Sequence, residues 1–136
     1  MFCDKARAYL SRNKAATFLV CQNVAAHMEA TAKSKAPWTD RTSHARQSIN
    51  ANAEKIGNAV IMHVSHGVKY GRFLEEGTAA HDIHLKNAKA FMWAGLPHPI
   101  SKNPIHHPGT KAMPAVLPAA EAGKVKLKES VMQLWR

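Results

Sequence analysis

The first 35 residues carry mostly apolar side chains at the spacing of a helix. Steps of three, four or seven place eight residues near one face: Phe2, Ala6, Leu10, Thr17, Cys21, Val24, Met28 and Ala32. Alanine is abundant and neither glycine nor proline occurs before Pro37, so helix propensity agrees with the spacing. Pro37 ends the pattern, because the residue before a proline is pushed out of the helical region. We predict a packing helix over residues 2–35.

A polar turn follows over residues 38–43 and contains one large aromatic residue, Trp38. Its Asp, Thr and Ser side chains can bond to nearby backbone groups, which stabilises such turns. We expect Trp38 at the edge of the core, and the alternative is an exposed anchor at an interface.

Two strands are predicted next. Residues 45–54 alternate weakly between apolar and polar side chains. Residues 58–65 alternate clearly, with Val60, Met62 and Val64 on one face of the predicted strand and Ile61 and His63 on the other. Gly57 and Asn58 between them are typical of a tight turn, which favours a hairpin. His63 and His66 are expected to face outward.

The stretch Tyr70–Thr78 combines a turn with a short amphipathic helix. Tyr70, Phe73 and Leu74 fall on one helical face, and Gly77 stands where the helix needs a left-handed C-terminal residue. This spacing is typical of a scaffold motif and does not suggest an active site.

The last third of the chain predicts short strands, a proline-rich segment and a helix. Residues 81–85 and 90–94 have strand patterns, and residues 106–110 favour a turn. From Met113 onward, apolar residues recur at steps of three or four: Val116, Ala120, Gly123, Leu127, Val131 and Leu134. Pro114 and Pro118 fit the opening turn of this helix, where a missing amide donor costs little.

These elements together predict one domain over residues 1–136 with an α+β fold. The elements follow one another in the order helix, hairpin, short helix, strands and helix. A loop or extended arm is expected at about residues 95–108, because four prolines prevent regular structure there.

Charge and cysteine content restrict the possible partners. Nineteen Lys and Arg against nine Asp and Glu give a net charge of +10, which favours an anionic partner, either nucleic acid or an acidic protein face. Lys124, Lys126 and Lys128 form a basic flank on the last helix. Cys3 and Cys21 lie too far apart on the first helix for a disulfide. We expect neither a secretory leader nor a membrane segment, since charged residues interrupt every apolar run.

The histidines are the strongest indication of catalytic or metal chemistry. Five lie in the second half: His81, His84, His98, His106 and His107. Their spacing matches no known zinc motif, and few carboxylates could orient them. An acid–base pair could join His106 or His107 to Asp82 or Glu76, but no nucleophile motif accompanies it. We expect no catalytic residues, no cofactor and no metal.

Four segments in order resemble one protein family. They are Lys35–Thr42 followed by Ala45–Ile49, then Tyr70–Thr78, Lys86–Ala90, and His106–Ala112 followed by Pro114. This order is similar to that of the neck and tail-completion proteins of tailed bacteriophages, which are head–tail joining or minor tail components. Two positions differ: Ser43 stands where many members have glycine, and Ala115 where an aromatic residue usually follows the proline.

The resemblance implies an α+β fold: a small antiparallel sheet with a long N-terminal helix, a short central helix and a C-terminal helix packed on it. It also implies a structural virion protein that is not an enzyme. Its expected role is a ring, hexameric by family expectation, that completes the tail and joins it to the head connector. Its expected neighbours are head-connector and tail-terminator or tail-tube proteins, with DNA passing nearby and the chain being made in the host bacterial cytoplasm. The residues that match the family motifs are expected to serve structure and interfaces: Pro37, Trp38, Arg41, Thr42, Arg46, Tyr70, Phe73, Glu76, Gly77, Thr78, His107, Pro108, Gly109, Thr110 and Pro114.

Two hypotheses concern how such a ring would form. The proline-rich arm would reach onto a neighbouring subunit or an adjoining ring, because it is stiff and docks at a low entropic cost. The Lys and Arg side chains would mostly face acidic neighbouring proteins, since a strongly basic lumen would slow passing DNA. The alternative function is a basic nucleic-acid-binding module, which the charge and the aromatic residues Trp38, Tyr70 and Trp93 favour. Against it, we assign these three aromatic residues to segments of the core.

Overall fold

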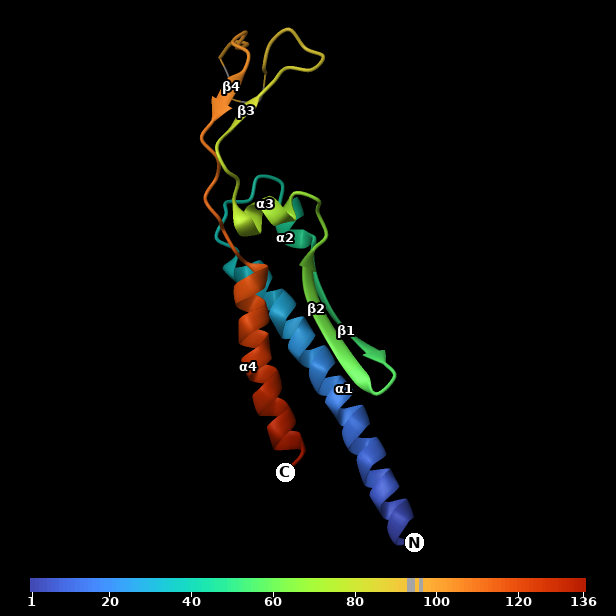
Figure 1. The fold of residues 1–136 in the computed structure, drawn as a ribbon. Helices are drawn as coiled ribbons and strands as arrows, with labels where there is room; N and C mark the ends of the chain where they lie inside the picture. The colour runs from blue at the N-terminus through green and yellow to red at the C-terminus, as the bar shows by residue number, and fades with distance from the viewer. Residues whose placement is uncertain (93–94, 96) are drawn as a thin grey trace.

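The body of the protein consists of two helices and a hairpin. The computed structural model describes residues 1–92, 95 and 97–136. Helix α1 (Phe2–Lys35) lies between helix α4 (Val116–Leu134) and a hairpin of strands β1 (Ile49–Ile56) and β2 (Ala59–His66), and α4 also contacts β2 (Figure 1). This is the predicted α+β fold, with a long N-terminal helix, small antiparallel sheets, a short central helix and a C-terminal helix packed on α1.

The core is small and rich in alanine. One cluster gathers Cys21, Val24, Ala25, Met28 and Ala53, and the second gathers Ala32, Ile49 and Ala119. Trp38 packs on the second cluster and is half-buried, which confirms its expected place at the core edge. Cys21 is buried and Cys3 is exposed, and both are free thiols.

Helix α1 has the predicted bounds, but its predicted stripe is buried only in part. The stripe packs from Cys21 to Ala32, whereas Ala6 and Leu10 are exposed. The first turns of α1 extend past the C-terminal end of α4 and past the hairpin turn (Figure 1). Helix α4 has 19 residues against 34 in α1, so the two cannot pack along their full lengths. Near its end, the Trp135 indole N–H donates to the Thr17 hydroxyl at 3.0 Å.

The hairpin forms as predicted around Gly57 and Asn58, with Ile56 paired to Ala59. The predicted start of the first strand is wrong, because residues 44–47 form a helical turn, α2 (His44–Gln47). Ser43 precedes α2 with a left-handed φ of 57°, and the Gln47 amide donates to the Ser43 carbonyl at 2.9 Å. A left-handed φ is the conformation that glycine adopts most easily, so Ser43 holds a backbone conformation that is unfavourable for its side chain.

A narrow ribbon, which begins with strand β3 (His81–Ile83) and ends with strand β4 (Ile105–His107), projects beyond helix α3 (Gly71–Glu76), away from the two long helices (Figure 1). Strand β3 pairs antiparallel with β4, and Phe91 bridges Ile100 further out. The expected turn at residues 106–110 is therefore wrong in part, since residues 106 and 107 belong to β4. Of the predicted strand 90–94, Phe91 forms the bridge, whereas Trp93 and Ala94 lie outside the described residues.

Helix α4 begins after Pro114 and includes Pro118 in its first turn. Its predicted stripe is buried or half-buried from Val116 to Leu134. Gly123 has a specific role here, because a Cβ at this position would lie 2.2 Å from the Met28 sulfur. The glycine lets α4 approach α1 closely. No helix in the described part of the chain is long and apolar enough to cross a membrane.

Candidate interaction site around the central helix

Arg46 fixes the turn that follows α1. Its guanidinium donates to the carbonyl oxygens of Lys33, Ala36 and Trp38, and it forms an ion pair with Asp40. The Lys33 and Ala36 carbonyls belong to the C-terminal end of α1, where unpaired acceptors favour a cation. The Trp38 indole donates to Asp40 at 3.2 Å, and the guanidinium carbon lies 5.9 Å from the centre of the Trp38 ring. Arg46 therefore caps the C-terminal end of α1 and orients Trp38.

Glu75 fixes the opposite end of the site, at the start of α4. One carboxylate oxygen accepts hydrogen bonds from the amides of Ala115 and Val116, both at 2.9 Å. The other accepts from Leu117 at 3.4 Å, and the His66 Nε2 lies 2.9 Å from the first. The carboxylate thus satisfies amides that a helix start leaves unpaired.

The pKa of Glu75 reflects this environment. Burial, the largest effect, would raise the pKa of the carboxyl group, but the hydrogen bonds from the α4 amides and His66 together outweigh it. The net result is a pKa below its ordinary value. Glu75 therefore stays ionised and keeps its hold on α4 under mildly acidic conditions.

His66 is buried, so the expectation that it faces outward is wrong. Its side chain is only 7% exposed, and its ring centre lies 5.8 Å from that of Trp38. The strand alternation already contained this information, because His66 shares the parity of the inward Val64, whereas His63 has the opposite parity and is exposed. Gly71 makes room for the ring, since a Cβ there would lie 2.3 Å from the His66 Cβ.

Two Gly-Thr pairs from the matching motifs join at the base of the ribbon. Thr78 and Thr110 exchange backbone hydrogen bonds, each at 3.0 Å, and their hydroxyl oxygens also lie 3.0 Å apart. Gly77 and Gly109 have positive φ angles of 75° and 87°. A Cβ at either would lie within 2.4 Å of a carbonyl oxygen of the opposing threonine. Both positions therefore require glycine, because the two backbone segments approach each other so closely at this bridge.

The predicted apolar face of α3 remains on the surface. Tyr70 is 46% exposed and Phe73 57% exposed, whereas Leu74 is half-buried. The interpretation of Tyr70 as a core residue is therefore wrong. Beside this face lies a groove of about 340 Å³. Its lining comes from the turn after α1, from α2, from the start and middle of α3 and from the segment before α4: Trp38, Thr39, Asp40, Arg41, Thr42, Ser43, His44, Ala45, Tyr70, Leu74 and Met113.

The remaining motif residues lie close to this groove or to the ribbon. Arg41 and Thr42 are exposed at the groove, and Pro37, Pro108 and Pro114 are exposed in extended segments. The His107 Nδ1 accepts from the Gly109 amide at 3.0 Å. Glu76 is exposed and pairs with Arg72 at 2.8 Å, so its neighbour Glu75 is the residue that joins the elements. The sequence does not single out Glu75, because Glu75 and Glu76 both follow the apolar pair Phe73 and Leu74.

The histidine-rich ribbon holds the acid–base pair that the sequence suggested. The Nδ1 of His106 lies 2.9 Å from Asp82, its partner in the register of β3 and β4, and both side chains are more than half exposed. His81 and His107 stack with ring centres 5.0 Å apart. Among the residues that the structure describes, no three His, Cys, Asp or Glu side chains gather as metal ligands would.

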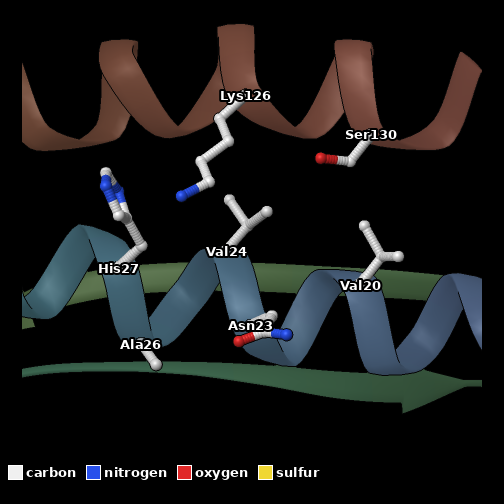
Figure 2. A pocket seen from close by; sticks show the side chains of 7 residues that line it. All are labelled: Val20, Asn23, Val24, Ala26, His27, Lys126 and Ser130. Atoms are coloured by element: carbon white, nitrogen blue, oxygen red, sulfur yellow. The ribbon is translucent and has the colours of Figure 1, made fainter. Parts of the chain in front are cut away.

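The three lysines on α4 do not share one surface. Figure 2 shows Lys126 extending from α4 toward α1 beside Val24, and Ser130 facing Val20. They line a cavity of about 420 Å³ between the two helices, together with Val20, Asn23, Val24, Ala26 and His27. Lys124 and Lys128 instead lie beside Val125 and Met132 on another face of α4.

Comparisons of the chain with protein-family models, with curated proteins and with solved structures find no match.

Proposed function

We propose that this chain is a structural virion protein of a phage neck or tail. It forms a ring that completes the tail and joins it to the head connector, and it acts by assembly rather than by catalysis. The identity rests on the resemblance of four ordered sequence segments. The observation that supports an assembly role is the amount of surface that a single copy leaves uncovered.

The surface of one copy is much larger than a compact monomer requires. The accessible area is 10235 Å² for a mass of 14.9 kDa. A compact monomer of this mass exposes about 7,000 Å², so the excess is about 3,000 Å². Obligate subunit interfaces bury roughly 2,000–5,000 Å² in total. The excess is thus of the size that contacts with neighbouring subunits cover.

The shape of the chain provides two different surfaces, as a ring requires. The ribbon projects from the body, and the groove beside Tyr70 and Phe73 lies near its base. A closed ring forms when one surface of each subunit fits a different surface of the next. The ribbon of one copy is the surface we assign to contact its neighbour.

Charge supports a protein neighbour with an acidic face. No acidic residue occurs between Asp82 and Glu121, whereas Lys86, Lys89 and Lys102 lie in the ribbon. A cationic ribbon is steered toward an anionic surface and repelled from a second cationic one. The head connector and the tail-terminator or tail-tube proteins are the neighbours to test.

The test compares ring formation by the full chain with that of a variant whose ribbon is shortened. Residues 84–104 are replaced by Asn-Gly, which joins the paired Ile83 and Ile105 through a two-residue turn. Light scattering and negative-stain imaging should show rings for the full chain, alone or with its neighbour protein. The shortened variant should keep its circular dichroism spectrum and lose the rings. A third variant with a Gly-Ser segment of equal length separates ribbon chemistry from ribbon length.

The alternative function, a basic nucleic-acid-binding module, is favoured by the net charge of +10. It predicts that the isolated chain binds duplex DNA with an affinity that falls steeply as salt rises. Rings that form without DNA and survive nuclease treatment favour the structural role. Tight, salt-sensitive DNA binding by a monomer that never forms rings would overturn it.

A further inference from the structure

The outer face of α4 carries an apolar stripe that the fold leaves uncovered. Leu117 is 61% exposed, Val125 59% and Met132 55%. Their spacing of eight and seven residues places them on one side of the helix, away from the stripe that packs on α1. Along the helix axis these side chains lie about 10–12 Å apart, with charged residues between them.

Charged residues of both signs border this stripe. Together with Val125 and Met132, four of them line a surface cavity of about 580 Å³: Glu121, Lys124, Lys128 and Glu129. Among the described residues, none of these four takes part in an intramolecular ion pair. Both signs of charge are thus available to a partner at the same face.

We propose that this face binds the same face of a second copy, with the two α4 helices antiparallel. A two-fold axis that crosses α4 between Lys124 and Val125 brings Leu117 of one copy opposite Met132 of the other. The same axis brings Glu121 opposite Lys128, and the two Val125 side chains meet beside it. A two-fold contact repeats every pair, so the Glu121–Lys128 ion pair and the Leu117–Met132 apolar pair each occur twice in the interface.

The self-complementarity of the face is what selects a second copy as the partner. An unrelated acidic protein would leave Glu121 and Glu129 facing like charges, whereas the antiparallel register pairs Glu121 with Lys128 and its apolar residues with one another. The contact covers about 15 residues of each helix, or roughly 22 Å. It buries on the order of 1,000 Å² in total, which is the low end for specific interfaces.

This contact goes beyond the proposed ring and does not depend on it. A chain that forms no ring would dimerise through α4, and a chain that forms rings would join two of them face to face. In either case, breaking the contact halves the mass of the particle.

The test is a charge exchange measured by analytical ultracentrifugation of the full chain. The substitution Lys128→Glu turns both copies of the ion pair from attraction to repulsion, and it should raise the dissociation constant at least about tenfold. Glu121→Lys should do the same. The double variant with both substitutions restores opposite charges and should recover the mass. Lys126→Glu is the matched control, because Lys126 points toward α1 (Figure 2) and should leave the mass unchanged.

Three results would overturn the proposal. The first is a particle mass that does not change with Lys128→Glu. The second is a double variant whose mass does not return to that of the natural chain. The third is a Lys126→Glu variant that dissociates as readily as Lys128→Glu. The last would mean that net charge, and not this pair, controls association. Circular dichroism of each variant excludes unfolding as the cause, and an apolar variant, Val125→Ser, should weaken the dimer with no change in net charge.

Discussion

Replacing Glu75 tests whether a buried carboxylate holds the start of α4. The informative variants are Glu75→Gln, which keeps the shape and removes the charge, and Glu75→Ala, which removes the acceptors. Glu76→Gln is the matched control, because it is the adjacent carboxylate but is exposed and pairs only with Arg72. Both glutamates lie in the same motif, so sequence alone gives no reason to expect different effects.

The magnitude follows from what the carboxylate binds. Glu75 accepts from three backbone amides at the start of α4 and pairs with the buried side chain of His66. A hydrogen bond to a charged group contributes about 1.5–3 kcal/mol, but such bonds at one group are not additive. We expect Glu75→Ala to lower the free energy of unfolding by about 3 kcal/mol and Glu75→Gln by about 1–2 kcal/mol. Glu76→Gln should change it by less than about 0.5 kcal/mol.

Urea unfolding followed by circular dichroism measures these differences. A loss of about 3 kcal/mol is a large part of the roughly 5–15 kcal/mol that stabilises an ordinary domain. Equal unfolding free energies for Glu75→Ala and Glu76→Gln would refute the reasoning. They would mean that water replaces the carboxylate at the helix start at no cost.

The pH dependence gives a second test of the same contact. The pKa of Glu75 is lowered in the folded chain, because the amide and His66 hydrogen bonds outweigh burial. Its stabilisation is therefore present in full above the ordinary pKa and is lost as pH falls through the lower folded value. The advantage of the natural chain over Glu75→Gln should be constant near neutral pH and shrink below about pH 4. A difference that stays constant into the acid range would contradict an ionised Glu75.

Three further substitutions test single backbone and packing features. Ser43→Gly should stabilise the chain by about 0.5–1 kcal/mol in thermal unfolding, because Ser43 has a φ of 57° that glycine adopts without strain. Gly109→Ala should accelerate hydrogen exchange at the Thr78 amide, with α1 and α4 unchanged, since its Cβ would lie 2.3 Å from the Thr78 oxygen. Gly123→Val should lower the stability by about 1–3 kcal/mol in urea unfolding, because the side chain would overlap Met28.

Elements with a long or regular pattern could be predicted from the sequence. The bounds of α1 follow from one unbroken helical period that ends at Pro37, and the hairpin follows from clear alternation on both sides of Gly57. The stripe of α4 was predicted as well, because its period of three or four continues over 19 residues. In each case many residues gave the same signal, so no single contact decided the outcome.

Features that depend on distant contacts could not be predicted in this way. The helical pattern of α1 gives no information about the length of α4. That Leu10 is exposed, because α4 is too short to cover it, therefore follows only from the folded arrangement of the two helices. Nor does the motif show which of Glu75 and Glu76 turns inward, because that depends on where the start of α4 lies. The brief helix α2 has too few residues to show a period. His66 is different, since the alternation of β2 placed it on the inward side.

The polar contacts of the central motif explain how a chain with so small a core can hold a defined surface. Most of the buried core is alanine, cysteine, valine and methionine, which buries little area for each residue. Glu75 and Arg46 instead tie the ends of two helices to the turn and to α3, through directional bonds that fix their relative positions. The same short helix then presents Tyr70 and Phe73 outward. Inward residues of the motif therefore contribute to stability, whereas its outward aromatic side chains remain accessible at the surface.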